Sequence, residues 1–411
     1  MVAAAASAAI AWKASLWKKS TPPSPRFWDR REISVKLAIL RQRYTPFGGA
    51  ERFLERAIAA LGREDMEITV ITRSWPGSGV SGAVRILALN PFYLGSTWRD
   101  AGFARASCRA VAAGKFDLVQ SHERIACCDV YRAGDGVHRE WLMQRARQRG
   151  LVGRSLDRLN PYHRYTLAAE RRLFTSPGLK AVVCNAHMVR EEIQRHFGVD
   201  RTKLHVIYNG VDTDAFHPGL RAEYRSALRA QLGLPEDAVV YLFVGSGFER
   251  KGVPLLLDLW PQLPAHAHLV VAGRDRSMQR CVKRAAGSGG RVHFVGAQKD
   301  VRPWYGLADV FVLPTLYDPC SNAALEALSC GLPVLTSSKC GASEWIVAGQ
   351  NGDVADALDA QKWRAILLAW LAPERRRQAR DAARASALPL TLEAMQQSYR
   401  DLYARLLTPQ T

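Results

Sequence analysis

The sequence predicts an α/β protein with two domains, each organised around a mainly parallel β-sheet. Three observations predict this class. From Val35 onward, short apolar runs typical of buried strands alternate with longer helical segments. A chain of 411 residues exceeds what one hydrophobic core ordinarily supports. The turn signal Asn209-Gly210 lies near the middle of the chain, and the alternating pattern starts again after it.

The first half contains six predicted strands and three predicted helices. Each strand is a short apolar run, and the helices fill intervals between strands. The strands are predicted at residues 35–40, 68–71, 84–87, 118–120, 181–184 and 206–208. The helices are predicted at about 50–61, 97–113 and 186–197.

The second half repeats this pattern, with strands predicted at residues 239–244, 268–272, 292–294, 310–313 and 334–336. A final helical run occupies residues 391–407. Ligands of parallel α/β sheets bind beyond the carboxyl ends of the strands. The segments of unusual composition fall at these strand ends, so we expect them to form the functional site.

The most informative segment follows the strand at 310–313. It carries Asp318 and, eight residues later, Glu326, and it leads into an Ala/Leu-rich helix that ends near Gly331. The start of a helix presents unpaired N–H groups and a positive partial charge, which favour a phosphate. The two carboxylates are spaced to hold hydroxyls at the two ends of one nucleotide-sugar. Taken alone, the segment is equally typical of a capped turn with an incidental glutamate.

Four further segments accompany this one along the chain. They are YTPFGGAE at residues 44–51, VIYNGVD at 206–212, GSGFERKG at 245–252 and LPVLT at 332–336. With the two carboxylates, they resemble the motifs of retaining GT-B glycosyltransferases of family four, with Asp318 in place of the first Glu of the E-x7-E motif. The resemblance covers residues 33–405 and is greatest to the lipopolysaccharide core glucosyltransferases of that family.

The resemblance implies a GT-B fold, in which two Rossmann-like domains face each other across a cleft. Residues 33–210 would form the acceptor-binding domain, and the helix at 391–407 would cross back to pack on it. Residues 211–390 would bind the nucleotide-sugar. Residues 1–32 are predicted to be a disordered or weakly membrane-adsorbing tail, because their apolar stretch lacks the preceding charges of a secretory signal.

The basic pair of the GSGFERKG loop stabilises the departing diphosphate in this family, which implies a catalytic role for Arg250 and Lys251. Fixed cations and backbone N–H groups can do this without a metal. The cysteines show no metal-ligand spacing, so neither a metal nor a cofactor is expected beside the UDP-sugar co-substrate. A solvated basic turn is the alternative for this pair.

The resemblance also implies the remaining donor contacts. Glu326 would accept hydrogen bonds from the ribose hydroxyls, and Asp318 from the transferred sugar. The other expected donor-binding residues supply backbone N–H groups or let the chain approach the phosphates closely. They are Gly48, Gly49, Gly247, Cys320, Ser321 and Asn322. Because Asp318 is one methylene shorter than Glu, the identity of the sugar stays open.

The catalytic group on the acceptor side is expected within residues 129–138. Many family members place a His after a middle strand of the first domain, and no His stands at the matching point here. The resemblance places Asp135 there, and its carboxylate could receive the proton of the acceptor hydroxyl. His138 is the alternative base, and an ordinary surface histidine is an equally good account of it.

The formal net charge of +19 predicts an anionic partner. Nine arginines lie between Arg139 and Arg172 against three acidic residues, interleaved with Trp, Tyr and Leu. Such a basic helical region is typical of a segment that lies on an anionic membrane surface; a solvated basic face is the alternative. No RRM, KH, zinc-finger or helix-turn-helix pattern accompanies the charge, so nucleic acid is not expected.

These observations predict a cytoplasmic enzyme, peripheral on the inner face of the inner membrane. It would transfer a hexose, glucose from UDP-glucose being expected, to a lipid-linked core oligosaccharide of lipopolysaccharide. Retention of configuration is implied by the family resemblance alone. The alternatives are a GT-B transferase that builds another surface glycan or exopolysaccharide from a different donor, and a non-catalytic anion-binding protein on the same fold. The eight cysteines are predicted to be free thiols in a reducing cytosol, and no apolar run approaches the length that spans a bilayer.

Overall fold

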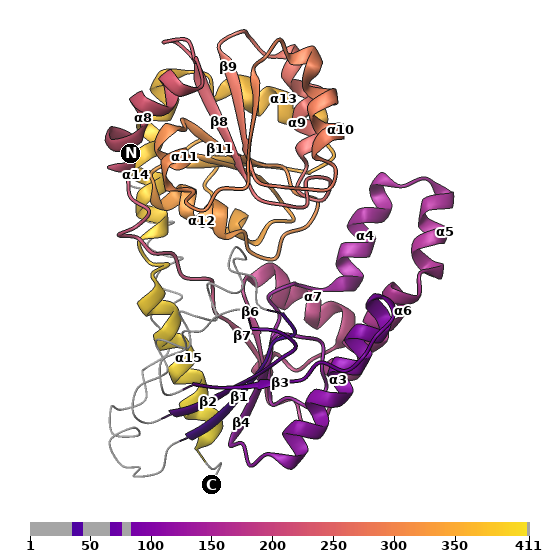
Figure 1. Cartoon of the computed structure of the whole chain (residues 1–411). Coiled ribbons are helices and arrows are strands. Elements are labelled where there is room, and N and C mark those ends of the chain that lie inside the picture. The colour runs from indigo at the N-terminus through magenta and orange to yellow at the C-terminus, as the bar shows by residue number, and fades with distance from the viewer. Residues whose placement is uncertain (1–34, 44–65, 76–83, 409–411) are drawn as a thin grey trace. The chain divides into compact units, whose positions relative to one another are not determined.

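The computed structural model describes residues 35–43, 66–75 and 84–408 (Figure 1). The described residues form two compact units: one spans Gly210–Thr391, and the other combines the described residues from Val35 to Asn209 with those from Leu392 onward. Each unit holds its own parallel sheet with helices, which confirms the predicted fold class. The tail at 1–32, the helix at 50–61 and the glycines Gly48 and Gly49 lie outside the described residues.

The sheet of the first unit has seven described strands in the order β3-β2-β1-β4-β5-β6-β7, and every described pairing is parallel. The strands are β1 Val35–Leu40, β2 Met66–Thr72, β3 Val84–Ala88, β4 Leu118–Ser121, β5 Val130–Arg132, β6 Ala181–Cys184 and β7 Leu204–Val206. The sequence did not predict β5, because three residues are too few to show a pattern. β7 begins and ends two residues earlier than the strand predicted at 206–208.

Six described helices belong to this unit. They are α3 Gly95–Ala113, α4 His138–Gln148, α5 Leu151–Leu159, α6 Pro161–Phe174, α7 His187–Phe197 and α15 Leu392–Leu407. The last one comes from the end of the chain, yet its apolar face packs into the core of the first unit through Met395, Tyr399 and Leu402. The hydroxyl of Tyr403 donates to Gln120 Oε1 at 2.6 Å on β4, which anchors α15 to the sheet (Figure 1).

The sheet of the second unit has six strands in the order β10-β9-β8-β11-β12-β13, again all parallel. The strands are β8 Val239–Val244, β9 Ala267–Ala272, β10 Val292–Gly296, β11 Val310–Leu313, β12 Val334–Ser337 and β13 Gly352–Ala355. The helices are α8 Leu220–Gln231, α9 Val253–Leu259, α10 Met278–Arg284, α11 Arg302–Leu307, α12 Asn322–Ser329, α13 Ala360–Ala369 and α14 Pro373–Ala387. The strand order reverses at β8 and β11, and ligands of such sheets bind beyond the carboxyl ends of strands at a reversal.

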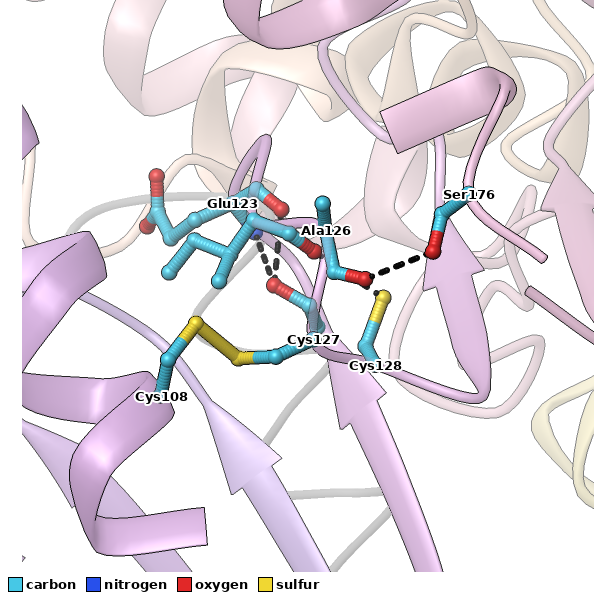
Figure 2. Close-up of a disulfide and its surroundings, with 8 residues drawn as sticks. Cys108, Glu123, Ala126, Cys127, Cys128 and Ser176 are labelled. Atoms are coloured by element: carbon cyan, nitrogen blue, oxygen red, sulfur yellow. Dashed lines mark hydrogen bonds between the residues drawn. A yellow bond between two sulfur atoms is a disulfide. The ribbon is translucent and has the colours of Figure 1, made fainter. Parts of the chain in front are cut away.

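Cys108 on α3 and Cys127 in the loop after β4 form a disulfide (Figure 2). This corrects the expectation that all cysteines are free thiols. The two residues stand 19 positions apart, but the packing of α3 beside the β4–β5 loop brings their Cα atoms to 5.7 Å, which no spacing rule reveals. The remaining six cysteines are free and buried.

Candidate active site

Glycines shape the loop that follows β8. Gly247 and Gly252 have φ values of +74° and +82°, which residues with a side chain rarely adopt. A Cβ on Gly252 would also lie 2.1 Å from the carbonyl oxygen of Pro314, so the close approach of these two segments requires glycine. The loop therefore passes directly against the chain that leaves β11.

Asp275, in the loop after β9, holds the glycine loop in place. Its Oδ2 accepts from the backbone N–H groups of Gly247 at 2.9 Å and Phe248 at 3.3 Å, while its Oδ1 accepts from Ser277. Burial favours the neutral carboxyl, but these hydrogen bonds outweigh it and lower the pKa of Asp275. The N–H group of Gly247 thus has an acceptor within the protein. Sequence reasoning missed Asp275, although the Asp-x-Ser turn was a signal.

The structure brings three predicted residues together at the ends of β8 and β11. Lys251 Nζ lies 3.3 Å and Arg250 Nη1 lies 3.7 Å from Asp318 Oδ2. The same Arg250 nitrogen donates to the carbonyl of Tyr317 at 2.6 Å. Two cations share one carboxylate, which leaves an excess positive charge beside the start of α12.

The segment before α12 is held by β-type contacts and a helix cap. Asp318 N–H donates to Lys339 O, and Gly341 N–H donates to Asp318 O, both at 2.9 Å. Ser321 is the N-cap of α12, and its hydroxyl accepts from Ala324 N–H. Cys320, Ser321 and Asn322 therefore stand at the helix start, as the sequence predicted.

Glu326 projects from the second turn of α12 towards α11. The hydroxyl of Tyr305 donates to Glu326 Oε2 at 2.9 Å and lies 3.1 Å from the carbonyl of Ala323. A buried tyrosine thereby fixes one carboxylate oxygen of the predicted ribose-binding residue. No sequence motif indicates Tyr305, because the contact joins two helices that are separate in the chain.

On the first unit, Asp135 lies exposed in the turn between β5 and α4. Glu123, in the loop after β4, accepts from Gln42 N–H at 2.9 Å and from Arg41 Nη1 at 3.5 Å. Burial raises the pKa of Glu123 and the negative charge of Asp135 raises it further, against the opposing effect of Arg41. Two carboxyl groups thus lie near each other beyond the sheet, and only Asp135 was predicted.

His138 occupies a different environment. It is the first residue of α4 and is buried, with Nε2 at 3.1 Å from His163 Nδ1 on α6. Its backbone N–H donates to Glu170 at 2.6 Å. Burial, together with the charge of Arg124, lowers the pKa of His138 to about 3. The ring is therefore neutral and serves the packing of α4 on α6.

A helical hairpin of α4 and α5, residues 138–159, carries much of the basic cluster (Figure 1). Arg145 and Arg149 on or beside α4 both pair with Asp157 on α5, at 3.4 and 3.1 Å. The outer surface of the hairpin exposes large apolar side chains, with Leu151 80% and Leu159 69% accessible. None of the described helices is both long enough and apolar enough to cross a membrane.

Two family profiles match the chain, one on each half. The profile described as "Glycosyltransferase Family 4" matches residues 47–215, and that described as "Glycosyl transferases group 1" matches residues 238–372. The two profiles, together with the two parallel sheets, define a glycosyltransferase of the GT-B class. The chain belongs to family four of these enzymes, as its motifs predicted.

Among curated proteins, the chain is similar to the lipopolysaccharide glucosyltransferase WaaG of Escherichia coli (strain K12), with 25% identity over 77% of this chain and 84% of the relative. It is 28% identical to the lipopolysaccharide core biosynthesis glycosyltransferase LpsE of Rhizobium meliloti, over 76% of this chain and 83% of the relative. A D-inositol 3-phosphate glycosyltransferase of Xylanimonas cellulosilytica is 33% identical over 50% of this chain, and the match spans about half of that relative, 52%.

Solved structures share the fold. The structure of WaaG, a glycosyltransferase involved in lipopolysaccharide biosynthesis, has a TM-score of 0.76 at 24% identity and covers 89% of this chain and 99% of that one. Anabaena HepE in complex with UDP-glucose has a TM-score of 0.67 at 20% identity, covering 90% of this chain and 99% of that one.

Proposed function

We propose that this protein transfers glucose from UDP-glucose, with retention of configuration, to the core oligosaccharide of a lipopolysaccharide. The observation that carries the proposal is the convergence of Arg250 and Lys251 on Asp318, beside the capped start of α12. The names of two relatives, WaaG and LpsE, support a lipopolysaccharide acceptor. The UDP-glucose complex of HepE, which shares the fold, supports the donor.

In this proposal, Arg250 and Lys251 stabilise the negative charge that develops on the departing diphosphate. They are held in place before the reaction by Tyr317 and Asp318, so little reorganisation accompanies charge transfer. The N–H groups at residues 320–322 add the positive end of α12 to the same phosphates. Gly48 and Gly49 are proposed as further phosphate contacts, since glycine allows a close approach of the backbone.

The two carboxylates would divide the remaining parts of the donor. Glu326, oriented by Tyr305, accepts from the ribose hydroxyls. Asp318 exchanges its contacts with the two cations for hydroxyls of the sugar once the diphosphate engages those cations. Recognition of the sugar therefore depends on phosphate binding, because the carboxylate of Asp318 contacts the two cations before the donor binds and the sugar hydroxyls afterwards.

For the acceptor, we assign proton removal to Asp135 rather than His138. Asp135 is exposed beyond the end of β5, where an acceptor can reach it, whereas His138 is buried against His163. A histidine whose pKa is about 3 is also a poor base near neutral pH. Glu123 lies near Asp135 and helps to set the charge of this region.

The α4–α5 hairpin supports a peripheral position on the cytoplasmic face of an anionic membrane. Its exposed leucines can enter the interface while its arginines meet lipid phosphates. The lipid-linked acceptor resides at such a surface. Localisation at the inner membrane follows from this proposal and from the lipopolysaccharide acceptor.

The test is a transfer assay with purified protein, radiolabelled UDP-glucose and lipopolysaccharide that ends before its first core glucose. Transfer that disappears in Lys251→Ala supports the proposal. UDP-galactose and ADP-glucose are tested as alternative donors, because Asp318 in place of Glu does not determine which sugar is bound. If the protein turns over a different donor, that donor replaces UDP-glucose in the proposal. If it transfers sugar only to a different glycan, that glycan replaces the lipopolysaccharide core. Binding of UDP-sugars without any turnover would refute the proposal.

A further inference from the structure

A small pocket lies in the second unit, at the end of the sheet opposite the donor loops. It is bounded by the start of α8, by α11, by the turn after α12 and by α14. Its polar lining includes His217, Arg221, Tyr305, Cys330 and Arg380. The pocket is small, with room for one small oxyanion in place of a few water molecules, but not for a nucleotide.

Positive charge accumulates on one side of this pocket. Arg221 and Arg225 on α8 each lie 3.1 Å from the buried carboxylate of Asp309. Burial lowers the pKa of Arg221 to about 10, and Arg225 and Arg380 lower it further against the opposing effect of Asp309. Asp309 also accepts from Val240 N–H at 3.0 Å. The carboxylate of Asp309 therefore contacts two arginines and one backbone N–H group, and Arg380 adds a third guanidinium nearby.

Arg380 differs from the arginines one turn away on the same face of α14. Arg376 donates to the carbonyls of Trp370 and Leu371, and Arg384 donates to Ser329 O at 2.8 Å. Among the described residues, no acceptor is found for the guanidinium of Arg380, which is partly buried at the pocket. Because Arg380 lines the pocket, its guanidinium can donate charge-assisted hydrogen bonds to an anion held there.

The pocket is separate from the donor site. Asp309 precedes β11, whereas Asp318 follows it, so the two sites lie at opposite ends of that strand. Tyr305 lines the pocket but donates its hydroxyl to Glu326 of the donor site. The phosphates of a donor bound beside Arg250 and Lys251 would not reach Arg380.

We propose that this pocket binds a small oxyanion, either free phosphate or the terminal phosphate of a phosphomonoester. Arg380 supplies the charge-assisted hydrogen bonds, and His217 also lines the pocket. Arg221 adds positive charge, although its Nη1 and Nη2 already donate to Ala308 O and Asp309 Oδ1, each at 3.1 Å. The apolar walls from Leu220 and Leu332 exclude water from the ion and strengthen these contacts.

The test is a titration with inorganic phosphate at fixed pH and ionic strength, followed by NMR of protein with 13C-labelled histidine. The His217 signal, assigned with His217→Gln, should shift in a saturable manner. Arg380→Gln should weaken phosphate binding at least about tenfold, the scale of one charge-assisted hydrogen bond. Arg377→Gln is the matched control, because this exposed residue of α14 pairs with Glu374 and should change nothing. A parallel titration with glycerol phosphate distinguishes the two ligand sources, and binding of either supports the site.

Three outcomes would overturn the proposal. One is no saturable shift of His217 with either phosphate compound. Another is an equal response to sodium chloride, which would indicate charge screening alone. The third is loss of phosphate binding in Lys251→Ala with retention in Arg380→Gln, which would place the ion at the donor loop.

Discussion

Lys251 Nζ lies 3.3 Å from Asp318 Oδ2, so a cation from the loop after β8 contacts the first carboxylate after β11. Gly245 makes room for this contact, because a Cβ there would lie 3.0 Å from Lys251 Nζ. The carboxylate positions the lysine beside the start of α12 before a donor arrives. The two residues therefore act as a unit, and a change at one alters the other.

The first prediction concerns the leaving group. Arg250→Ala and Lys251→Ala should each lower kcat about 100- to 1,000-fold, as happens when one preorganised electrostatic donor is lost. The fold should remain, since both side chains lie at a loop rather than in the core. Lys362→Ala, which removes an exposed cation on α13, is the control. Near-normal turnover in both loop variants would contradict the assignment.

A second prediction separates the two candidate bases. Asp135→Asn keeps the shape of the side chain but removes most of its basicity, so transfer should fall about 100- to 10,000-fold with little change in UDP binding. His138→Gln should cost far less at equal folded fraction, because the ring is buried and neutral. The rate of transfer and the affinity for UDP are measured for each variant, so a loss of catalysis can be distinguished from a loss of donor binding. The reverse ranking would assign the base to His138.

A third prediction follows from the same histidine. The pKa of His138 is about 3 in the folded protein, whereas an unfolded chain titrates near 6.5. Between these values the unfolded state binds more protons, so this group makes stability fall as pH decreases below about 6.5; above that pH its contribution is constant. In urea unfolding between pH 4.5 and 6.5, His138→Gln should reduce the slope by up to about 1.4 kcal/mol per pH unit. Parallel profiles for the two proteins would contradict burial of a neutral ring.

A fourth prediction addresses the disulfide. Cys108–Cys127 closes a loop with a sequence separation of 19, so its reduction should lower the free energy of unfolding by about 3 kcal/mol. Cys108→Ser should cost a similar amount and should make stability insensitive to reductant. Thiol titration of the native protein supplies the direct check. If the protein purified without oxidant has eight titratable thiols after denaturation, the bond does not form under those conditions.

Most strands could be predicted because they are apolar and central. β1, β6, β8 and β11 have the predicted bounds, since uninterrupted buried runs leave little choice of ends. β5 and β13 were missed: the first has three residues, and the second reads Gly-Asp-Val-Ala, which shows no apolar run.

Only those residues of the candidate site that belong to sequence motifs could be predicted. Arg250, Lys251 and Asp318 stand in recognisable segments, and the structure brings them together. Asp275 and Tyr305 were missed, since their importance comes from hydrogen bonds to residues distant in the chain. Tertiary contacts of this kind leave no local pattern.

The last prediction concerns the α4–α5 hairpin and refines which arginines should matter. Arg145 and Arg149 pair with Asp157, and Arg154 Nε donates to the carbonyls of Ala146 and Arg149, so all three stabilise the hairpin itself. Arg154 and Arg158 on α5 are also exposed, so their charges are available to lipid. Arg154→Gln/Arg158→Gln should therefore weaken binding to anionic vesicles about 30-fold at low salt, because each basic residue near such a surface contributes roughly 1 kcal/mol.

Sedimentation with vesicles of acidic and of neutral lipid measures this effect. Arg364→Gln/Arg377→Gln removes the same charge from exposed positions of the second unit and is the control. Leu156→Ser/Leu159→Ser should weaken binding to acidic vesicles as well and make the remaining binding more sensitive to salt, because the apolar contribution is lost. Equal binding of wild type to acidic and neutral vesicles, or equal losses in the control, would leave the hairpin as a solvated basic surface.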